Sequence, residues 1–392
     1  MRIEAVDFFY LAMPEITTDA DGSQDALLVR VAAGGEVGWG ECEASPLVSI
    51  AGFVCPMSHG VCRPVGAAVL GETLEDPADI ARIAARVAYD SMDLLQAPHT
   101  FSGVEMALWD ALGKIRQEPV WRLLGYVRSC PKLPYASQLF GEDAEATLQR
   151  SRAAAAAGFA AMKFGWGPIG QADARADAEH FVAAREGLGP DAVLLVDAGQ
   201  IWGEDVEAAA ARLPALQAAR ATWLEEPFHT GALAAYGRLA QRSGMVKLAG
   251  GEGAHNVAMA RHLMEYGGVG FIQIDCGRIG GIGPAKAVAD EAVARGVTFV
   301  NHTFTSHLAL SASLQPFAGL ADHRLCEYPF APRALAWDLS VNHILPDSAG
   351  EIALPEAPGL GIEIDKAKLQ SYLVPVTIEV KSRELYRSPA LD

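Results

Sequence analysis

The sequence predicts an α/β fold in which eight parallel strands alternate with helices and close into a barrel. From residue 133 onward, eight short apolar runs alternate with seven Ala/Leu-rich helical patterns. Three consecutive runs end in an acid at nearly equal spacing. Alternation of this kind is typical of parallel strands, and eight of them close naturally into a barrel. An open doubly wound sheet is the alternative, but no GxGxxG motif follows a first strand.

The three acid-ended runs lie between residues 192 and 253. They end at Asp197, Glu225 and Glu252, which are 28 and 27 positions apart, the length of one strand-helix unit. Each run is short, apolar and bounded by Gly or Pro, which indicates a strand buried on both faces. Neighbouring parallel strands bring the three carboxylates to one point, where they repel one another unless a cation lies between them. Ligands that are all oxygen suit a hard ion such as Mg²⁺.

The composition excludes several classes of protein. The chain has 392 residues, 51% hydrophobic and 20% charged, enough for one large globular domain and a smaller one. A formal charge of −17 without a basic run disfavours nucleic acid and anionic membranes as partners. Six cysteines without CxxC spacing predict reduced thiols. The first residues lack the apolar core of a signal peptide and no membrane-spanning stretch is present, so a cytoplasmic protein is expected.

Residues 1–130 differ in character and predict an α+β domain. The hairpin signal Gly34-Gly35 joins two of its strands. Two long loops, 14–25 and 43–65, are expected, and loops of that length are usually functional lids or disordered. A separate binding module is the alternative, but no site stands alone in this region. The expected elements are strands at 2–10, 26–31 and 36–41 and helices at 77–87 and 100–116.

Residues 131–335 are expected to form the barrel. Residues 336–392 form a tail too long for one barrel helix, and we expect it to return to the N-terminal domain. Pro214 must kink or end the helix in which it stands. The expected strands are 133–140, 160–164, 193–197, 222–225, 246–248, 271–275, 298–301 and 324–328. The expected helices are 144–157, 172–187, 204–220, 231–242, 255–266, 284–295 and 306–318.

Further ionisable residues stand at strand ends, where barrel enzymes place their active sites. They are Lys163, Asp275, His302 and Glu327, at the ends of the second, sixth, seventh and eighth strands. Any one of them taken singly is also explained as a satisfied buried pair. An ionisable group at the end of seven successive strands favours a catalytic site.

Six short motifs along the chain resemble the sequence pattern of a known enzyme family. They are Trp39-Gly40-Glu41-Cys42, Ala107-Leu108-Trp109-Asp110, Trp223-Leu224-Glu225-Glu226-Pro227, Gly251-Glu252, Asp275-Cys276-Gly277-Arg278-Ile279-Gly280-Gly281 and Pro358-Gly359-Leu360-Gly361. As a set they resemble the mandelate racemase subgroup of the enolase superfamily, closest to its acid-sugar dehydratases, over the whole chain. The resemblance implies a (β/α)7β modified TIM barrel beneath an α+β capping domain built from N-terminal and C-terminal segments.

The resemblance also implies roles for the strand-end residues. Asp197, Glu225 and Glu252 would bind Mg²⁺, which grips the substrate carboxylate and stabilises the enediolate left when the α-proton is removed. His302 and Asp275 match the family's dyad. A carboxylate on one imidazole nitrogen fixes the tautomer and raises the basicity of the other nitrogen.

Three more residues stand near these positions, and the resemblance accounts for the first of them. Glu327 matches the position that hydrogen-bonds the substrate carboxylate opposite the metal. His307 competes with His302 for the role of base, but it lies at the start of a helix and is expected to cap or line a wall. Glu226 should point to the other side of its strand and serve a structural role.

Two departures bear on the reaction. The family's racemases carry Lys-x-Lys on the second strand, whereas this chain has Lys163-Phe164-Gly165. Lys163 is then either a base or a group that binds substrate. Some dehydratases of the group place a histidine acid where this chain has Gly199.

The favoured function is Mg²⁺-dependent removal of water from a sugar acid, an aldonate or aldarate, to give a 2-keto-3-deoxy acid. A racemase or epimerase of an α-hydroxy acid is the alternative, with Lys163 as second base, and an inactive binding homologue is the third. The partner is then a small carboxylate, and the family favours homo-oligomers. Candidate substrate contacts are Asp19, Asp21, Gln24 and His59, with solvated loop residues as the alternative. Trp166, just past the second strand, is expected either to form a wall of the site or to pack in the core.

Overall fold

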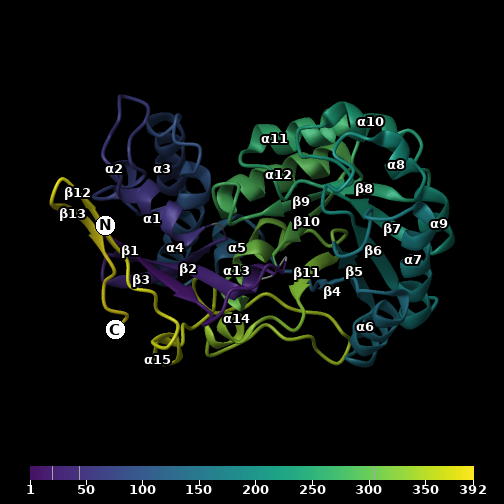
Figure 1. The fold of residues 1–392 in the computed structure, drawn as a ribbon. Coiled ribbons are helices and arrows are strands. Elements are labelled where there is room, and N and C mark those ends of the chain that lie inside the picture. The colour runs from purple at the N-terminus through teal and green to yellow at the C-terminus, as the bar shows by residue number, and fades with distance from the viewer. Residues whose placement is uncertain (20, 44, 304) are drawn as a thin grey trace.

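The computed structural model describes residues 1–392 apart from positions 20, 44 and 304. Positions 20 and 44 fall within the two predicted loops and lie outside the described residues. An eight-stranded barrel forms one side of the molecule, and a smaller domain with both chain termini forms the other (Figure 1). The predicted barrel with a capping domain is confirmed.

The barrel strands are all parallel and follow the order β10-β9-β8-β7-β6-β5-β4-β11. Inward-facing side chains fill its lower end, where Tyr135 meets Trp223 edge-on at 5.6 Å between ring centroids. Packing of this kind makes the barrel a solid core. A site can form at the end where the strands finish, which is called the upper end of the barrel below. The strands are β4 (Leu133–Leu139), β5 (Ala161–Gly165), β6 (Val193–Asp197), β7 (Ala221–Glu225), β8 (Lys247–Gly250), β9 (Phe271–Asp275), β10 (Thr298–His302) and β11 (Leu325–Pro329).

The surrounding helices follow the prediction with three local differences. The helix expected at 204–220 is divided into two, and Pro214 is the second residue of the second one, where a missing N–H costs least. The helix expected at 255–266 continues into a π-helical turn, η2 (Leu263–Gly267), and that at 306–318 into a 3₁₀ turn, η3 (Gln315–Phe317). The helices are α6 (Ala144–Ala156), α7 (Ala174–Leu188), α8 (Val206–Ala210), α9 (Leu213–Ala218), α10 (Leu233–Ala240), α11 (Val257–His262), α12 (Ile282–Arg295) and α13 (His307–Leu314).

The capping domain is an antiparallel sheet packed on the long helix α4. Gly38 and Gly40 allow the close approach, because a Cβ at either position would lie 2.0 or 2.1 Å from a backbone oxygen of α4. The elements are β1 (Ile3–Ala12), η1 (Gly22–Gln24), β2 (Asp25–Ala33), β3 (Glu36–Cys42), α1 (Pro46–Val54), α2 (Gly66–Val69), α3 (Pro77–Asp90), α4 (Ala97–Arg116) and α5 (Val120–Leu123).

One prediction for this domain is wrong. The segment 43–65, expected to be a loop, contains helix α1. Pro46 stands at its start, a position compatible with a helix, and Ile50 and Phe53 are buried in the core. The Pro and Gly residues of this segment therefore mark the helix ends and not a continuous loop.

Buried carboxylates join the parts of the chain. Glu105 of α4 accepts the backbone N–H groups of Ile282 and Gly283 at the start of α12, at 2.7 and 2.8 Å. Asp110 of α4 accepts the N–H of Trp39 at 2.8 Å and that of Leu360 at 2.7 Å. The capping domain is thereby fixed to both the barrel and the C-terminal segment.

The C-terminal segment runs back along the capping domain. The N–H of Val374 donates to the carbonyl of Tyr10 at 2.8 Å, beside the first strand. Its elements are α14 (Ala334–Asp338), α15 (Lys366–Leu369), β12 (Thr377–Val380) and β13 (Arg383–Arg387). Among the helices of the described residues, none combines the length and apolar character needed to cross a bilayer.

Candidate active site

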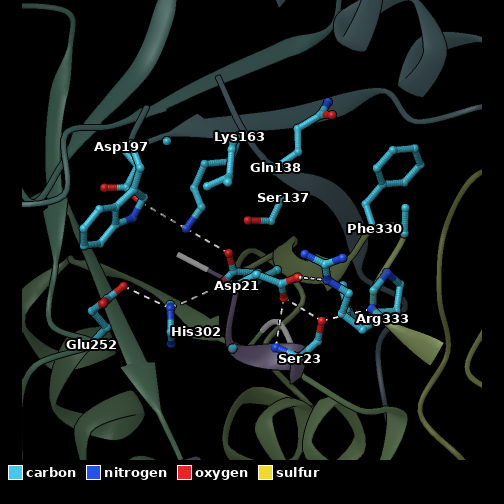
Figure 2. Close-up of a pocket in the computed structure, with 18 of the residues that line it drawn as sticks. Asp21, Ser23, Ser137, Gln138, Lys163, Asp197, Glu252, His302, Phe330 and Arg333 are labelled. Carbon is cyan, nitrogen blue, oxygen red and sulfur yellow. Dashed lines mark hydrogen bonds and ion pairs between the residues drawn. The ribbon is translucent and has the colours of Figure 1, made fainter. Parts of the chain in front are cut away.

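The predicted strand-end residues surround one cavity at the upper end of the barrel. Its volume is about 770 Å³, and Lys163, Asp197, Glu252, His302 and Glu327 are among its lining residues (Figure 2). The parallel register accounts for the convergence, because Asp197 pairs with Glu225 and His302 with Asp275 across neighbouring strands. Glu252 follows the end of β8 by two residues.

The acid cluster consists of Asp197, Glu225, Glu226 and Glu252. Burial, together with neighbouring carboxylates, raises the pKa of Asp197 to about 7 and those of Glu225 and Glu226 to about 8. Such crowding of acids favours binding of a cation. Burial alone would raise the pKa of Glu252 as well, but His302 and Arg278 hold it well below its usual range.

Basic side chains balance these acids in the structure. The Lys163 ammonium lies 2.8 Å from both Glu225 Oε1 and Glu327 Oε1, and 3.9 Å from Asp197 Oδ2 (Figure 2 draws it beside Asp197). Burial would lower the pKa of Lys163, but the carboxylates raise it well above its ordinary value. Lys163 therefore lies as a cation between two carboxylates.

The acids form an all-oxygen donor set that suits a hard divalent ion. Among the described residues, however, no set of three or more His, Cys, Asp or Glu side chains is already arranged so that it could hold a metal ion. Glu226 Oε1 is buried without a hydrogen-bond partner among the described atoms. Its other oxygen accepts from Gln200 Nε2 at 2.7 Å, and the backbone of Glu226 is left-handed, with φ of 37°. The residue types fit Mg²⁺, with Asp197, Glu225 and Glu252 as the predicted ligands.

The histidine and aspartate predicted as a dyad are hydrogen-bonded. His302 Nδ1 lies 2.6 Å from Asp275 Oδ2, and Asp275 Oδ1 accepts the N–H of Gly277 at 2.6 Å. This arrangement fixes the imidazole ring and leaves Nε2 on the cavity side, 3.0 Å from Glu252 Oε2. Burial would lower the pKa of His302, but Glu252, Glu327 and Asp275 raise it well above its ordinary value.

The other histidine, His307, lies outside the cavity. Its Nδ1 accepts the N–H of Ile344 at 3.2 Å, and its ring packs against Trp337 and His343. Burial and the neighbouring His343 lower the pKa of His307 to about 4. It is a packing residue of the C-terminal segment.

The two glycines noted in the sequence leave room for other groups. A Cβ at Gly165 would lie 2.8 Å from Asp197 Oδ2, and one at Gly199 would lie 2.8 Å from Trp166 Cδ2. The Asp197 carboxylate and the Trp166 indole therefore fill the space beside these glycines. Trp166 lines the cavity and has a left-handed backbone with φ of 56°.

The loop over the cavity is fixed by an arginine that the sequence reading missed. Arg333 donates from Nε to Asp21 Oδ2 at 2.8 Å, and its Nη2 lies 3.1 Å from Asp19 Oδ2 (Figure 2 shows the bond to Asp21). Asp21 lines the cavity, as expected. Arg333 follows β11, so its place after a strand end was the available signal.

Three expected substrate contacts are not among the described residues that line the cavity. Asp19 pairs with Arg333 at 3.1 Å instead. Gln24 is buried and bonds within its own loop, for example to the N–H of Thr17 at 2.7 Å. His59 is exposed and pairs with Asp93 at 2.9 Å.

Arg278 is another residue whose role was missed. It makes a bidentate ion pair with Glu43 of the capping domain, with Nη2 2.6 Å from Oε1 and Nε 2.7 Å from Oε2. Its Nη1 lies 3.0 Å from Glu252 Oε1. Its place in the motif that begins at Asp275 was the available sequence signal. The pair links the capping domain to a predicted metal ligand.

Comparison with known proteins agrees with this geometry. Residues 146–368 match the model of the enolase C-terminal domain-like family, and residues 11–125 match the mandelate racemase / muconate lactonizing enzyme N-terminal domain. A crystal structure of a predicted mandelate racemase from Rhodobacter sphaeroides superposes with a TM-score of 0.96, at 66% identity over 99% of both chains.

Curated relatives include more than one type of enzyme. The D-galactarolactone cycloisomerase of Agrobacterium fabrum is 28% identical, over 87% of this chain and 89% of its own. The D-galactonate dehydratase of Variovorax paradoxus is 28% identical, over 82% and 87%. With both domain models matched in order along the sequence, the chain belongs to the mandelate racemase / muconate lactonizing enzyme family of the enolase superfamily.

Proposed function

We propose that the protein is a Mg²⁺-dependent dehydratase that removes water from a sugar acid to give a 2-keto-3-deoxy acid. The observation that carries the proposal is the one-sided arrangement of bases. The His302–Asp275 dyad faces the cavity from β10 and β9, whereas Gly165 stands where a second lysine would be needed on β5. A racemase needs a base on each face of the α-carbon.

The side chains of the cavity divide into two groups. Asp197, Glu225 and Glu252 would hold Mg²⁺, which, when bound, supplies positive charge beside the substrate carboxylate, where negative charge develops. His302 Nε2 would take the α-proton, while the bond from Nδ1 to Asp275 keeps the ring in place.

Lys163 and Glu327 would orient the substrate carboxylate. They lie 2.8 Å apart at the base of the cavity, and both are almost completely buried. In this proposal Lys163 serves as a cation that binds the substrate and not as a base, because Gly165 takes the place of the second lysine of the racemase motif. Its ammonium balances the charge of an acidic ligand entering the cavity.

The curated relatives are named for different reactions. They include dehydratases and cycloisomerases. The test is a panel of aldonates and aldarates with Mg²⁺, in which 2-keto acid is measured chemically and the C2 proton is followed by NMR in D₂O. We expect a keto acid from at least one member.

Three other outcomes would contradict the proposal. Inverted or racemised C2 without keto acid would identify a racemase or epimerase. Turnover of the corresponding lactones without keto acid would identify a cycloisomerase. Bound Mg²⁺ with neither exchange nor product across the panel would identify an inactive binding homologue.

A further inference from the structure

The barrel has a seam between β10 and β11. The eight strands form one ladder in which β10 and β11 are the two end members, so the described residues include no backbone ladder between these two strands. The strands nevertheless lie side by side and carry two of the proposed functional residues, His302 and Glu327. Something other than a ladder must fix these two residues relative to each other.

The side chain of Asn301 spans the seam. Its Oδ1 accepts the backbone N–H of Glu327 at 2.9 Å, and its Nδ2 donates to the backbone carbonyl of the same residue at 3.2 Å. In a parallel ladder, one residue exchanges two such bonds with the neighbouring backbone. Here a single amide side chain makes both bonds in place of that backbone.

The sequence position of Asn301 couples the seam to the site. Side chains alternate along a strand, so His302 faces the cavity while Asn301 faces outward, towards Ser313 of α13. Asn301 Nδ2 donates to Ser313 Oγ at 2.9 Å, and Asn301 is fully buried. The residue next to the proposed base therefore holds the backbone of Glu327.

The side chain of Glu327 is held by the residue that follows β10. Its Oε2 accepts the N–H of Thr303 at 2.9 Å, and its Oε1 lies 2.8 Å from Lys163 Nζ. Residues 301 and 303 thus bind the backbone and the carboxylate of Glu327 on either side of His302. The distance from the imidazole to this carboxylate depends on the seam remaining closed.

We infer that Asn301 is a positioning residue that closes the barrel by its side-chain amide and so sets Glu327 relative to His302. The inference rests on the proposed function for its catalytic consequence and on the hydrogen bonds alone for its structural part. Misplacement of a reacting group by about 1 Å costs on the order of 10²-fold in rate.

The experiment compares Asn301→Leu, which removes both bonds at similar volume, with Asn301→Asp, which keeps the acceptor and loses the donor. We expect kcat to fall by roughly 10–100-fold in Asn301→Leu, with KM changing less, and by a smaller factor in Asn301→Asp. Amide hydrogen exchange of the peptide that carries Glu327 should accelerate in the same order. Ser313→Ala, which leaves both bonds to Glu327, should change neither quantity by more than about twofold.

The chain offers a matched control. Asn342 makes a similar pair of hydrogen bonds to the backbone of two residues on the exposed surface: its Nδ2 donates to the carbonyl of Gly361 at 2.8 Å, and its Oδ1 accepts the N–H of Glu363 at 2.8 Å. Asn342→Leu should accelerate exchange near residue 363 and leave kcat unchanged.

Two results would overturn the inference. One is parental kcat in Asn301→Leu, and the other is an unchanged exchange rate at Glu327. If Asn301→Leu does not fold, Asn301→Asp decides by the same two measurements. A parent enzyme without dehydratase activity would contradict the proposed function. The amide exchange rates would still test whether Asn301 holds β10 and β11 together.

Discussion

The indole ring of Trp166 lies on the α-carbon of Gly199, so close that a Cβ added at position 199 would be 2.8 Å from Cδ2 and 2.9 Å from Cε2. Trp166 is 46% exposed and lines the cavity beside Asp197. One side of the ring is therefore covered by the glycine, and the remaining surface is available to a ligand. Left-handed backbone at a tryptophan is strained, and such strain is common at functional sites.

The first prediction concerns this ring. Trp166→Ala should raise KM for the sugar acid by roughly 5–30-fold, because an aromatic surface against the C–H groups of a ligand contributes about 1–2 kcal/mol. Trp166→Phe should retain most of the affinity. Steady-state kinetics of both variants provide the measurement.

Trp337 supplies the control, because it is 41% exposed and stacks on His343 outside this cavity. Trp337→Ala should leave KM unchanged. Equal KM values for Trp166→Ala and the parent would mean that the ring only fills the space over Gly199.

The second prediction concerns the metal ligands. Glu252→Gln should abolish turnover and weaken Mg²⁺ binding by at least roughly tenfold, because the amide removes a negative charge from a hard-ion site. Calorimetric titration with Mg²⁺ alone measures the affinity without substrate. Glu265→Gln, an exposed change of the same kind, is the control. An unchanged Mg²⁺ affinity would refute Glu252 as a ligand.

The barrel could be predicted because its signals are local. Each strand is a short apolar run, and the residue at its end faces the site whatever the surrounding helices do. Asp197, Glu225, Asp275 and His302 therefore come together from strand order alone. Helix α1 was missed because a proline at its start resembles a loop signal in the sequence.

The remaining parts of the site depend on contacts between distant segments. Arg333 reaches Asp21 across 312 positions of sequence, and Arg278 reaches Glu43 across 235. Trp166 covers Gly199 because of a left-handed backbone conformation that no residue pattern indicates. In the sequence, nothing distinguishes Asn301 except that it precedes a histidine at a strand end. Its two bonds to Glu327 require the barrel to be closed first.

The third prediction concerns acid stability. His99 of α4 and His255, which follows β8, lie 2.8 Å apart between Nε2 and Nδ1. Burial, His255 and the nearby Arg278 lower the pKa of His99 from 6.5 to about 4, although Asp275 acts in the opposite direction. The unfolded chain therefore binds more protons between pH 6.5 and 4, so stability falls as the pH is lowered through this window.

His99→Gln should remove part of that loss, about 1–2 kcal/mol once solvent screening of this partly exposed pair is allowed for. The measurement is the difference between melting temperatures at pH 7.5 and pH 5. That difference should shrink in His99→Gln and stay parental in His262→Gln, an exposed histidine. Parallel profiles for His99→Gln and the parent would contradict the assignment.

The last prediction concerns how one histidine serves two steps. His302 is the group best placed to carry a proton at the α- and β-carbons, because Trp166 and the Asp197 carboxylate occupy the space beside Gly199 and Gly165. After taking the α-proton, the imidazolium would return a proton to the departing β-hydroxyl from the same face. Asp275, 2.6 Å from Nδ1, stabilises the imidazolium in between. The elimination would therefore be syn.

The two candidate bases respond differently to substitution if this is correct. Each acid-base step is worth about 10²–10⁴-fold, so His302→Asn should show neither keto acid nor exchange of the C2 proton in D₂O. Lys163→Ala should keep the exchange and lose mainly substrate affinity, since Lys163 is held as a cation between Glu225 and Glu327. A His302→Asn enzyme that still dehydrates at a sizeable rate would contradict the double role. So would a preferred substrate whose proton and hydroxyl leave from opposite faces, because one imidazole reaches only one face and Lys163 would then have to act as the second catalyst.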